Sequence, residues 1–250
     1  MFSLNPSGTT KFDWHFRVWG IDVRVHPLFW LVTFLMASHT NAASVASWFL
    51  ACFVSLLVHE LGHVLAMRWT GGHGSVLLYG FGGLAIPTRR WQRSVADQVT
   101  ISFAGPLAGF VLATATVAAV VGMGGAVDLA TGGIGLPTLR GDVKNLAQMN
   151  YPLYFFLHYF VNQLLWVNIY WGLINLLPVL PLDGGSIAKA LLSTQPDGLR
   201  KSLQLSTVTG AIVAALALLT GSTWVACMFG FFAYQSWEQI GNRSPYRDGC

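Results

Sequence analysis

The amino-acid sequence predicts an all-α polytopic membrane protein. Of its 250 residues, 54% are hydrophobic and only 10% are charged, and the mean hydropathy is +0.54. A soluble domain carries about 25% charged residues, because it needs a polar surface however large its core is. The apolar residues lie in long stretches separated by short basic segments, which is typical of chains that cross a bilayer several times. We therefore expect one membrane domain over residues 1–250.

Six apolar stretches are expected to form about six transmembrane helices. About 20 apolar residues cross the hydrocarbon core, and five of the stretches approach or exceed that length. The first is short, and it would need Ile21–Val25 or its neighbour to complete a span. The region Gly122–Asn150 is expected to be an external loop, and residues 186–250 hold the C-terminal helices. The stretches are Pro27–Ser38, Ala43–Met67, Val95–Met123, Tyr151–Leu180, Leu203–Thr220 and Trp224–Ile240.

Lysine and arginine alternate along the connections between these stretches. They occur in the N-terminal segment, after the second and fourth stretches and in the C-terminal tail, and are absent after the first and fifth. The long connection after the third stretch holds only two. The positive-inside rule then places both termini, and the loops after spans two and four, in the cytoplasm of a multi-pass cell-membrane protein. Topology explains the formal net charge of +4 better than nucleic-acid binding does.

The segment 71–87, which follows the second stretch, differs from an ordinary loop. It reads GGHGSVLLYGFGGLAIP, an apolar but glycine-rich sequence with short alternating runs that is too interrupted for a helix. Irregular backbone at membrane depth is tolerated where it lines a protein cavity or water. The segment is therefore predicted to form a short membrane-associated β-hairpin or a re-entrant segment.

The second stretch contains His59, Glu60 and His63 in the sequence HELGH. On a helix, positions i and i+4 project from one face, so both imidazoles can reach one metal ion, and the adjacent carboxylate can accept a proton from water. Such a cluster occurs by chance on surface helices, but leaving it unligated within an apolar span is costly. We therefore expect one catalytic Zn²⁺ ion bound by His59 and His63, with Glu60 as the general base.

A catalytic zinc site usually has three protein ligands, so one more is expected. Spans two and four run in the same direction, and both HELGH and Asp183 lie toward their cytoplasmic ends. Asp183 is the candidate, although Asp-Gly-Gly is also ordinary turn chemistry. Pro178 and Pro181 are expected to break the fourth helix just before Asp183. Asn175 would either stabilise a tetrahedral intermediate or join two spans by hydrogen bonding, and Asn168 is expected to serve packing.

Three motifs together resemble the site-2 protease family of intramembrane zinc metalloproteases. They are HELGH, the FAGP of Phe103–Pro106 and the NLLPVLPLDGG of Asn175–Gly185, and the opening GIDVRVHPLF resembles prokaryotic members. The resemblance implies a three-helix catalytic core over 43–185, zinc ligation by His59, His63 and Asp183, and catalytic roles for Glu60 and Asn175. It also implies that the glycine-rich hairpin binds an unwound substrate by strand addition. The PDZ and CBS domains that many relatives carry are not expected in these 250 residues, nor is regulation or substrate delivery through them.

The expected reaction is hydrolysis of a peptide bond within or next to a transmembrane segment of another membrane protein, releasing a cytoplasmic signalling fragment. The partners are thus a transmembrane protein and the lipid bilayer. The alternative is a membrane zinc transporter or metal-binding regulator without protease activity, but a transporter should carry polar residues along a path across the bilayer. A prenyl-protein-type protease would need a glutamate ligand, and Glu238 lies in an unsuitable context. His26 is expected to cap a helix or lie at the interface, and His73 to lie near the metal site.

Overall fold

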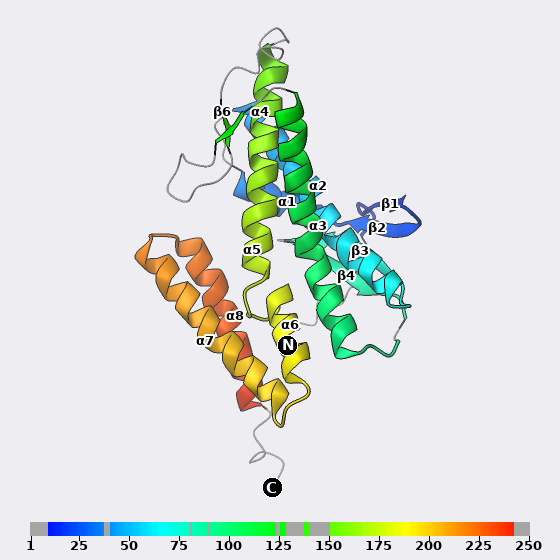
Figure 1. Ribbon diagram of the computed structural model, residues 1–250. Helices are drawn as coiled ribbons and strands as arrows, with labels where there is room; N and C mark the ends of the chain where they lie inside the picture. Colours follow the sequence, from blue (N-terminus) through cyan, green and yellow to red (C-terminus); the bar gives the residue numbers. More distant parts are fainter. Residues whose placement is uncertain are drawn as a thin grey trace. The chain divides into compact units, whose positions relative to one another are not determined.

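The computed structural model describes residues 10–37, 41–80, 82–89, 91–123, 126–128, 138–140 and 151–242 (Figure 1). They belong to two compact units. One unit comprises Met1–Trp91 and Leu107–Trp171, and the other comprises Gln92–Pro106 and Gly172–Cys250. Most of the predicted external loop Gly122–Asn150 lies outside the described residues. The described part of this loop includes two short antiparallel strands, β5 (Ala126–Asp128) and β6 (Thr138–Arg140).

Among the residues that the structure describes, three helices are long and apolar enough to cross a membrane, which supports a mostly helical, multi-pass membrane protein. They coincide with the second, third and fifth predicted spans. The first predicted span is the apolar helix α1, whose 10 residues extend about 15 Å, or half the thickness of the hydrocarbon core. The count of six spans stays a prediction. The helices are α1 (Pro27–Met36), α2 (Ala42–Trp69), α3 (Val95–Gly122), α4 (Tyr151–Trp166), the π-helical turn η1 (Val167–Trp171), α5 (Gly172–Asn175), α6 (Asp183–Leu192), α7 (Gly198–Leu219) and α8 (Thr223–Gly241).

A four-stranded sheet corrects the all-helical prediction. The predicted hairpin over 71–87 is present as β3 (Gly74–Tyr79) and β4 (Gly82–Pro87), which pair antiparallel. However, a second hairpin, β1 (Trp14–Val18) and β2 (Ile21–Val25), adds to it through parallel pairing of β2 with β3. The strand order is β1-β2-β3-β4. The suggestion that Ile21–Val25 extends the first span is therefore wrong.

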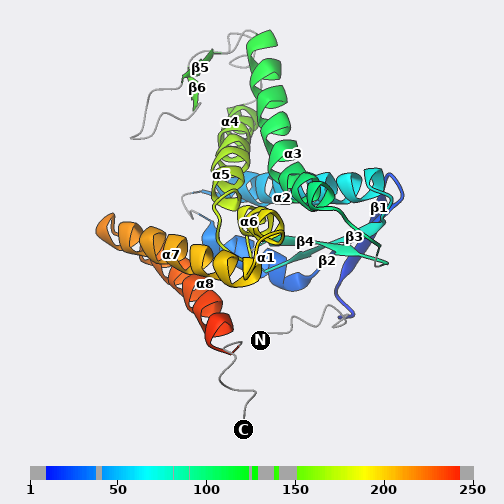
Figure 2. The ribbon, with the colours of Figure 1, turned by 60° about the horizontal axis from the view of Figure 1, so that its bottom comes forward.

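The N-terminal hairpin forms because its sequence alternates and its turn suits the twist of the strands. Val18 pairs with Ile21, so the turn is the dipeptide Trp19-Gly20, and both residues have positive φ angles, 48° and 69°. The apolar residues of β2 all point to one face, where they join the core of the first unit. Figure 2 shows α2 lying along this sheet, and the two elements share that core. Its buried members are Ile21, Val23, Val25, Phe29, Leu56, Leu61, Val64, Val76 and Leu78.

In the second unit, α7 and α8 form an antiparallel pair (Figures 1 and 2). They approach closely at Gly210, where a Cβ atom would lie 3.1 Å from Cβ of Ala233. The fourth predicted span ends as a helix at Asn175. This confirms the expected break before Asp183, although Asp183 begins a new helix, α6, and is not part of a helix-terminating turn.

Candidate metal centre

Helix α2 buries three groups that can bind a metal ion. His59, Glu60 and His63 have relative exposures of 6%, 5% and 7%, and their ligand atoms all lie within 4.8 Å of one another. The Nε2 atoms of His59 and His63 are 3.2 Å apart, and the two rings are nearly perpendicular, at 83°. One helical turn thus brings the imidazoles together, as the HELGH spacing predicts.

This geometry fits a zinc ion. Nitrogen ligands bind zinc at about 2.0–2.1 Å in tetrahedral sites, so two of them lie about 3.3 Å apart along one edge of the tetrahedron. The observed 3.2 Å between the two Nε2 atoms matches that edge. The two imidazoles therefore have the spacing that zinc requires.

Strand β4 packs directly against Glu60. A Cβ atom at Gly83 would lie 2.2 Å from Cγ and 2.5 Å from Oε1 of Glu60, so only glycine leaves room for this carboxylate. Gly74 of β3 also packs closely against α2, one turn after His63, since a Cβ atom at Gly74 would lie 3.0 Å from Sδ of Met67. The glycine-rich hairpin is thus fitted to the metal-binding turns of α2.

Comparison with known proteins identifies the family. The model of peptidase family M50 matches residues 47–219 of the 250. The chain belongs to this family. The buried His59–Glu60–His63 cluster, which has the HExxH spacing and could hold a metal ion, lies within the matched residues.

Relatives of this M50 chain are similar along most of its length. A zinc metalloprotease of Methanocaldococcus jannaschii is 27% identical over 231 residues, which are 90% of this chain and 59% of that protein. Stage IV sporulation protein FB of Bacillus subtilis is 25% identical over 233 residues, 89% of this chain and 67% of that protein. The chain thus spans about three fifths to two thirds of their length. The solved structure of the site-2 protease from M. jannaschii has the same fold, with a TM-score of 0.55 and 21% identity over 92% of this chain and 95% of that one.

Polar contacts between α2 and the α4–η1 segment support the metal-binding turn. Asn168 is buried, and its Nδ2 donates hydrogen bonds to Oγ of Ser55 and to the carbonyl of Leu164, both at 2.8 Å. Ser55 lies one turn before His59. Gly109 of α3 adjoins the same amide, since its Cβ would lie 3.1 Å from Oδ1 of Asn168. This confirms the packing role predicted for Asn168.

The other two predicted site residues belong to the second unit of this M50 chain. Asp183 is the first residue of α6 and is half-buried, and Asn175 is the last residue of α5 and is buried, with 7% exposure. The structure brings His59, Glu60 and His63 together within the first unit. The roles of Asp183 and Asn175 remain predictions.

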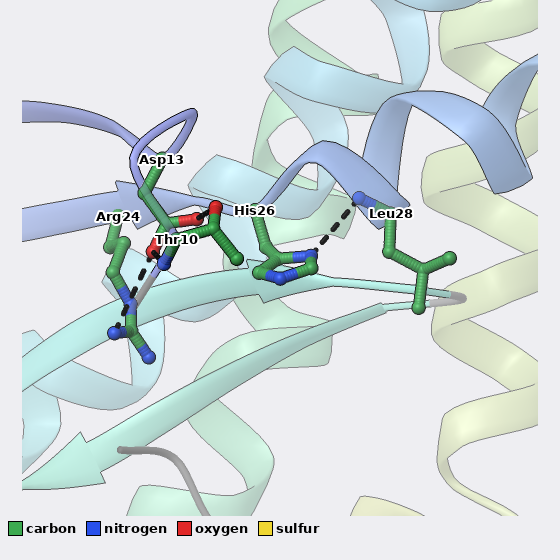
Figure 3. Close-up of polar contacts among 5 residues, drawn as sticks. All are labelled: Thr10, Asp13, Arg24, His26 and Leu28. Atoms are coloured by element: carbon green, nitrogen blue, oxygen red, sulfur yellow. Dashed lines mark hydrogen bonds and ion pairs between the residues drawn. The ribbon is translucent and has the colours of Figure 1, made fainter. Parts of the chain in front are cut away.

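Two further histidines considered in the sequence are His26 and His73. His26 caps α1, as predicted: its Nδ1 accepts a hydrogen bond of 3.0 Å from the backbone N–H of Leu28 (Figure 3). His73 is exposed, and its carbonyl accepts hydrogen bonds from the N–H and hydroxyl of Thr88, which close the base of the β3–β4 hairpin.

Figure 3 also shows the contacts that hold the start of β1. The hydroxyl of Thr10 donates a 2.6 Å hydrogen bond to Asp13, which is the main reason that the pKa of the Asp13 carboxyl is lowered. Arg24 of β2 lies 3.8 Å from the same carboxylate and adds to this effect. Asp13 is therefore ionised near neutral pH and ties the start of β1 to β2.

Proposed function

We propose that this chain is an intramembrane zinc metalloprotease that hydrolyses a peptide bond within or next to a transmembrane segment of another membrane protein. The observation that carries the proposal is the buried His59–Glu60–His63 cluster in an apolar helix long enough to cross a membrane. An unpaired charge at that depth is costly, so a carboxylate beside two imidazoles indicates a function.

In the proposed site, His59 and His63 bind zinc through their Nε2 atoms, and Asp183 supplies the third ligand. Bound zinc would polarise the scissile carbonyl and lower the pKa of water toward about 7. Asp183 is supported by its carboxylate chemistry, by its place in the NLLPVLPLDGG motif and by the need for a third ligand. Three protein ligands leave one position for the substrate or water.

Glu60 acts as general base and acid in this scheme. Its carboxylate accepts a proton from the attacking water and donates it to the nitrogen of the leaving amine. Burial and the close backbone of Gly83 restrict the rotamers of Glu60, which keeps the carboxylate oriented. Asn175 is proposed to stabilise the tetrahedral intermediate by donating from its side-chain amide.

The open edge of β4 is proposed to bind the substrate as an extended strand. Tyr79 and Gly82 flank a two-residue turn and form a hydrogen-bonded pair, so the N–H and C=O groups of Gly83 and Ala85 point to the outer edge. Pro87, which has no N–H, occupies the next position of the same orientation. Among the described residues, no strand pairs with that edge.

This edge passes directly beside the general base, because Gly83 contacts Glu60. A substrate helix hides its own peptide groups, so it must unwind before hydrolysis. Pairing with Gly83 and Ala85 would satisfy the exposed backbone and hold the scissile bond in an extended form.

Six spans with cytoplasmic termini are proposed on the basis of the alternating basic residues. The site would then face the cytoplasmic side, and cleavage would release a cytoplasmic fragment used in signalling. The substrate of such a reaction is another membrane protein, cut within or next to one of its transmembrane segments.

Co-expression with candidate single-span proteins tests the proposal. Glu60→Gln should abolish cleavage while the purified protein keeps one zinc ion, since the imidazole ligands are unchanged. Glu238→Gln is the matched control, because Glu238 is exposed near the end of α8. This variant should cleave the substrate like the wild type. Cleavage at the normal rate by Glu60→Gln would disprove the general-base role. Zinc flux across proteoliposomes, with no cleavage, would favour the transporter alternative.

A further inference from the structure

The segment Leu176–Leu182, between α5 and α6, determines where Asp183 lies. Pro178 and Pro181 prevent a regular helix, and the segment instead folds back on itself: the N–H of Leu182 donates to the carbonyl of Val179 at 2.8 Å. Its backbone rests on the first turn of α6. A Cβ atom at Gly184 would lie 2.1 Å from the carbonyl oxygen of Leu176, so this turn packs against the segment at a distance that only glycine permits.

One backbone group of the segment is bonded from another helix. The N–H of Leu180 donates a 2.8 Å hydrogen bond to Oγ of Ser206, in α7. That oxygen also lies 2.8 Å from Oγ of Ser236, in α8. Both serines are buried, with exposures of 0% and 1%. Since Ser206 accepts from Leu180, its own hydroxyl proton is available for Ser236, and the three groups form one connected chain.

The hydrogen bond from Leu180 to Ser206 matters because the backbone around Leu180 is irregular and packs near an apolar helix. Helix α7 is apolar enough to cross a membrane, and irregular backbone at membrane depth persists only where protein or water satisfies its polar groups. The N–H of Leu180 is three residues from Asp183. Losing its acceptor would leave the N–H unsatisfied and favour another arrangement of the segment.

We propose that Ser206, oriented by Ser236, is a positioning residue for Asp183. The hydroxyl pair fixes the backbone at Leu180, and the close contact of the segment with α6 transmits that fixed position to the Asp183 carboxylate. The inference rests on the proposed function, in which Asp183 is the third zinc ligand. The α7–α8 pair thereby contributes to metal retention without supplying a ligand.

Zinc dissociation from the purified full-length protein, measured with a fluorescent chelator, tests this role. Ser206→Ala should raise the zinc dissociation constant about three- to tenfold, the range that corresponds to the loss of one hydrogen bond. Ser236→Ala should have a smaller effect in the same direction, because Leu180 keeps its acceptor. Ser202→Ala is the matched control: Ser202 is buried in the same helix, but its hydroxyl donates within α7, to the carbonyl of Leu199 at 2.8 Å.

The same substitutions in an Asp183→Ala background separate positioning from general destabilisation. If Ser206 acts through Asp183, Ser206→Ala should not weaken zinc binding further once the carboxylate is gone. A further loss there, or equal dissociation constants for Ser206→Ala and Ser202→Ala, would overturn the positioning role alone. Unchanged zinc binding in Asp183→Ala itself would overturn both the third-ligand assignment and the positioning role.

Discussion

Replacing Gly83 with alanine tests whether strand β4 positions the catalytic carboxylate. The new Cβ would lie 2.2 Å from Cγ of Glu60, whereas non-bonded carbon atoms stay about 3.5 Å or more apart. The strand and the side chain must therefore separate by about 1.3 Å. A displacement of about 1 Å in a catalytic group can reduce the rate about 100-fold. We expect kcat/KM to fall by about that factor while zinc stays bound to His59 and His63.

The assay compares Gly83→Ala with Gly82→Ala, using a single-span substrate found by co-expression, in proteoliposomes. Gly82 is the neighbouring residue of the same strand, and a Cβ atom there meets nothing within 4 Å. Gly82→Ala should therefore cleave like the wild type. Zinc content and thermal unfolding of both variants verify that the fold and the metal site persist. Equal activity of the two variants would refute the idea that the Gly83 contact orients Glu60.

Three further predictions address the sheet and the helix interface. Ala85→Pro removes an N–H from the open edge of β4 and should lower cleavage without changing thermal unfolding, and unchanged cleavage would contradict strand addition. Asn168→Ala removes the bond to Ser55 and should lower the free energy of unfolding in detergent by about 1 kcal/mol, as read from denaturation curves. The pKa of Asp13 is lowered below 3.8, so its contribution to stability is present above pH 3.8 and is lost as the pH falls below that value. The protection factors of the β1 amides in hydrogen exchange should therefore fall in acid, and Thr10→Val should remove most of that dependence.

The metal centre could be predicted from the sequence because its geometry is local. His59 and His63 are four residues apart on one helix, so the helical repeat alone brings their rings together. The hairpin over 71–87 could also be predicted from the sequence, since its glycines and alternating apolar residues lie within one short segment. Both the metal-binding turn and this hairpin are formed by residues that are close together in the sequence.

The four-stranded sheet could not be predicted in the same way. Its second hairpin consists of two five-residue strands around Trp19-Gly20, and β2 pairs with β3 only after two intervening helices. The contact of Gly83 with Glu60 is similarly non-local, although it lies in a segment already marked by glycine. The turn chemistry of Asp-Gly-Gly left a helix-terminating turn as the alternative role for Asp183, but this residue begins α6, where Gly184 permits a close approach to Leu176.

The parallel pairing of β2 with β3 also constrains how the chain is inserted into the bilayer. Two hydrogen-bonded strands lie at nearly the same depth in the membrane. If α2 crosses the membrane between β2 and β3, the chain between Val25 and Asn41 must therefore cross it in the opposite direction. Helix α2 is about 42 Å long, and α1 supplies about 15 Å of the return. The two hairpins can meet only if the number of crossings between them is even. A chain whose α2 entered the membrane without that return would hold β2 and β3 on opposite sides, so the sheet beside Glu60 assembles only in a correctly threaded protein.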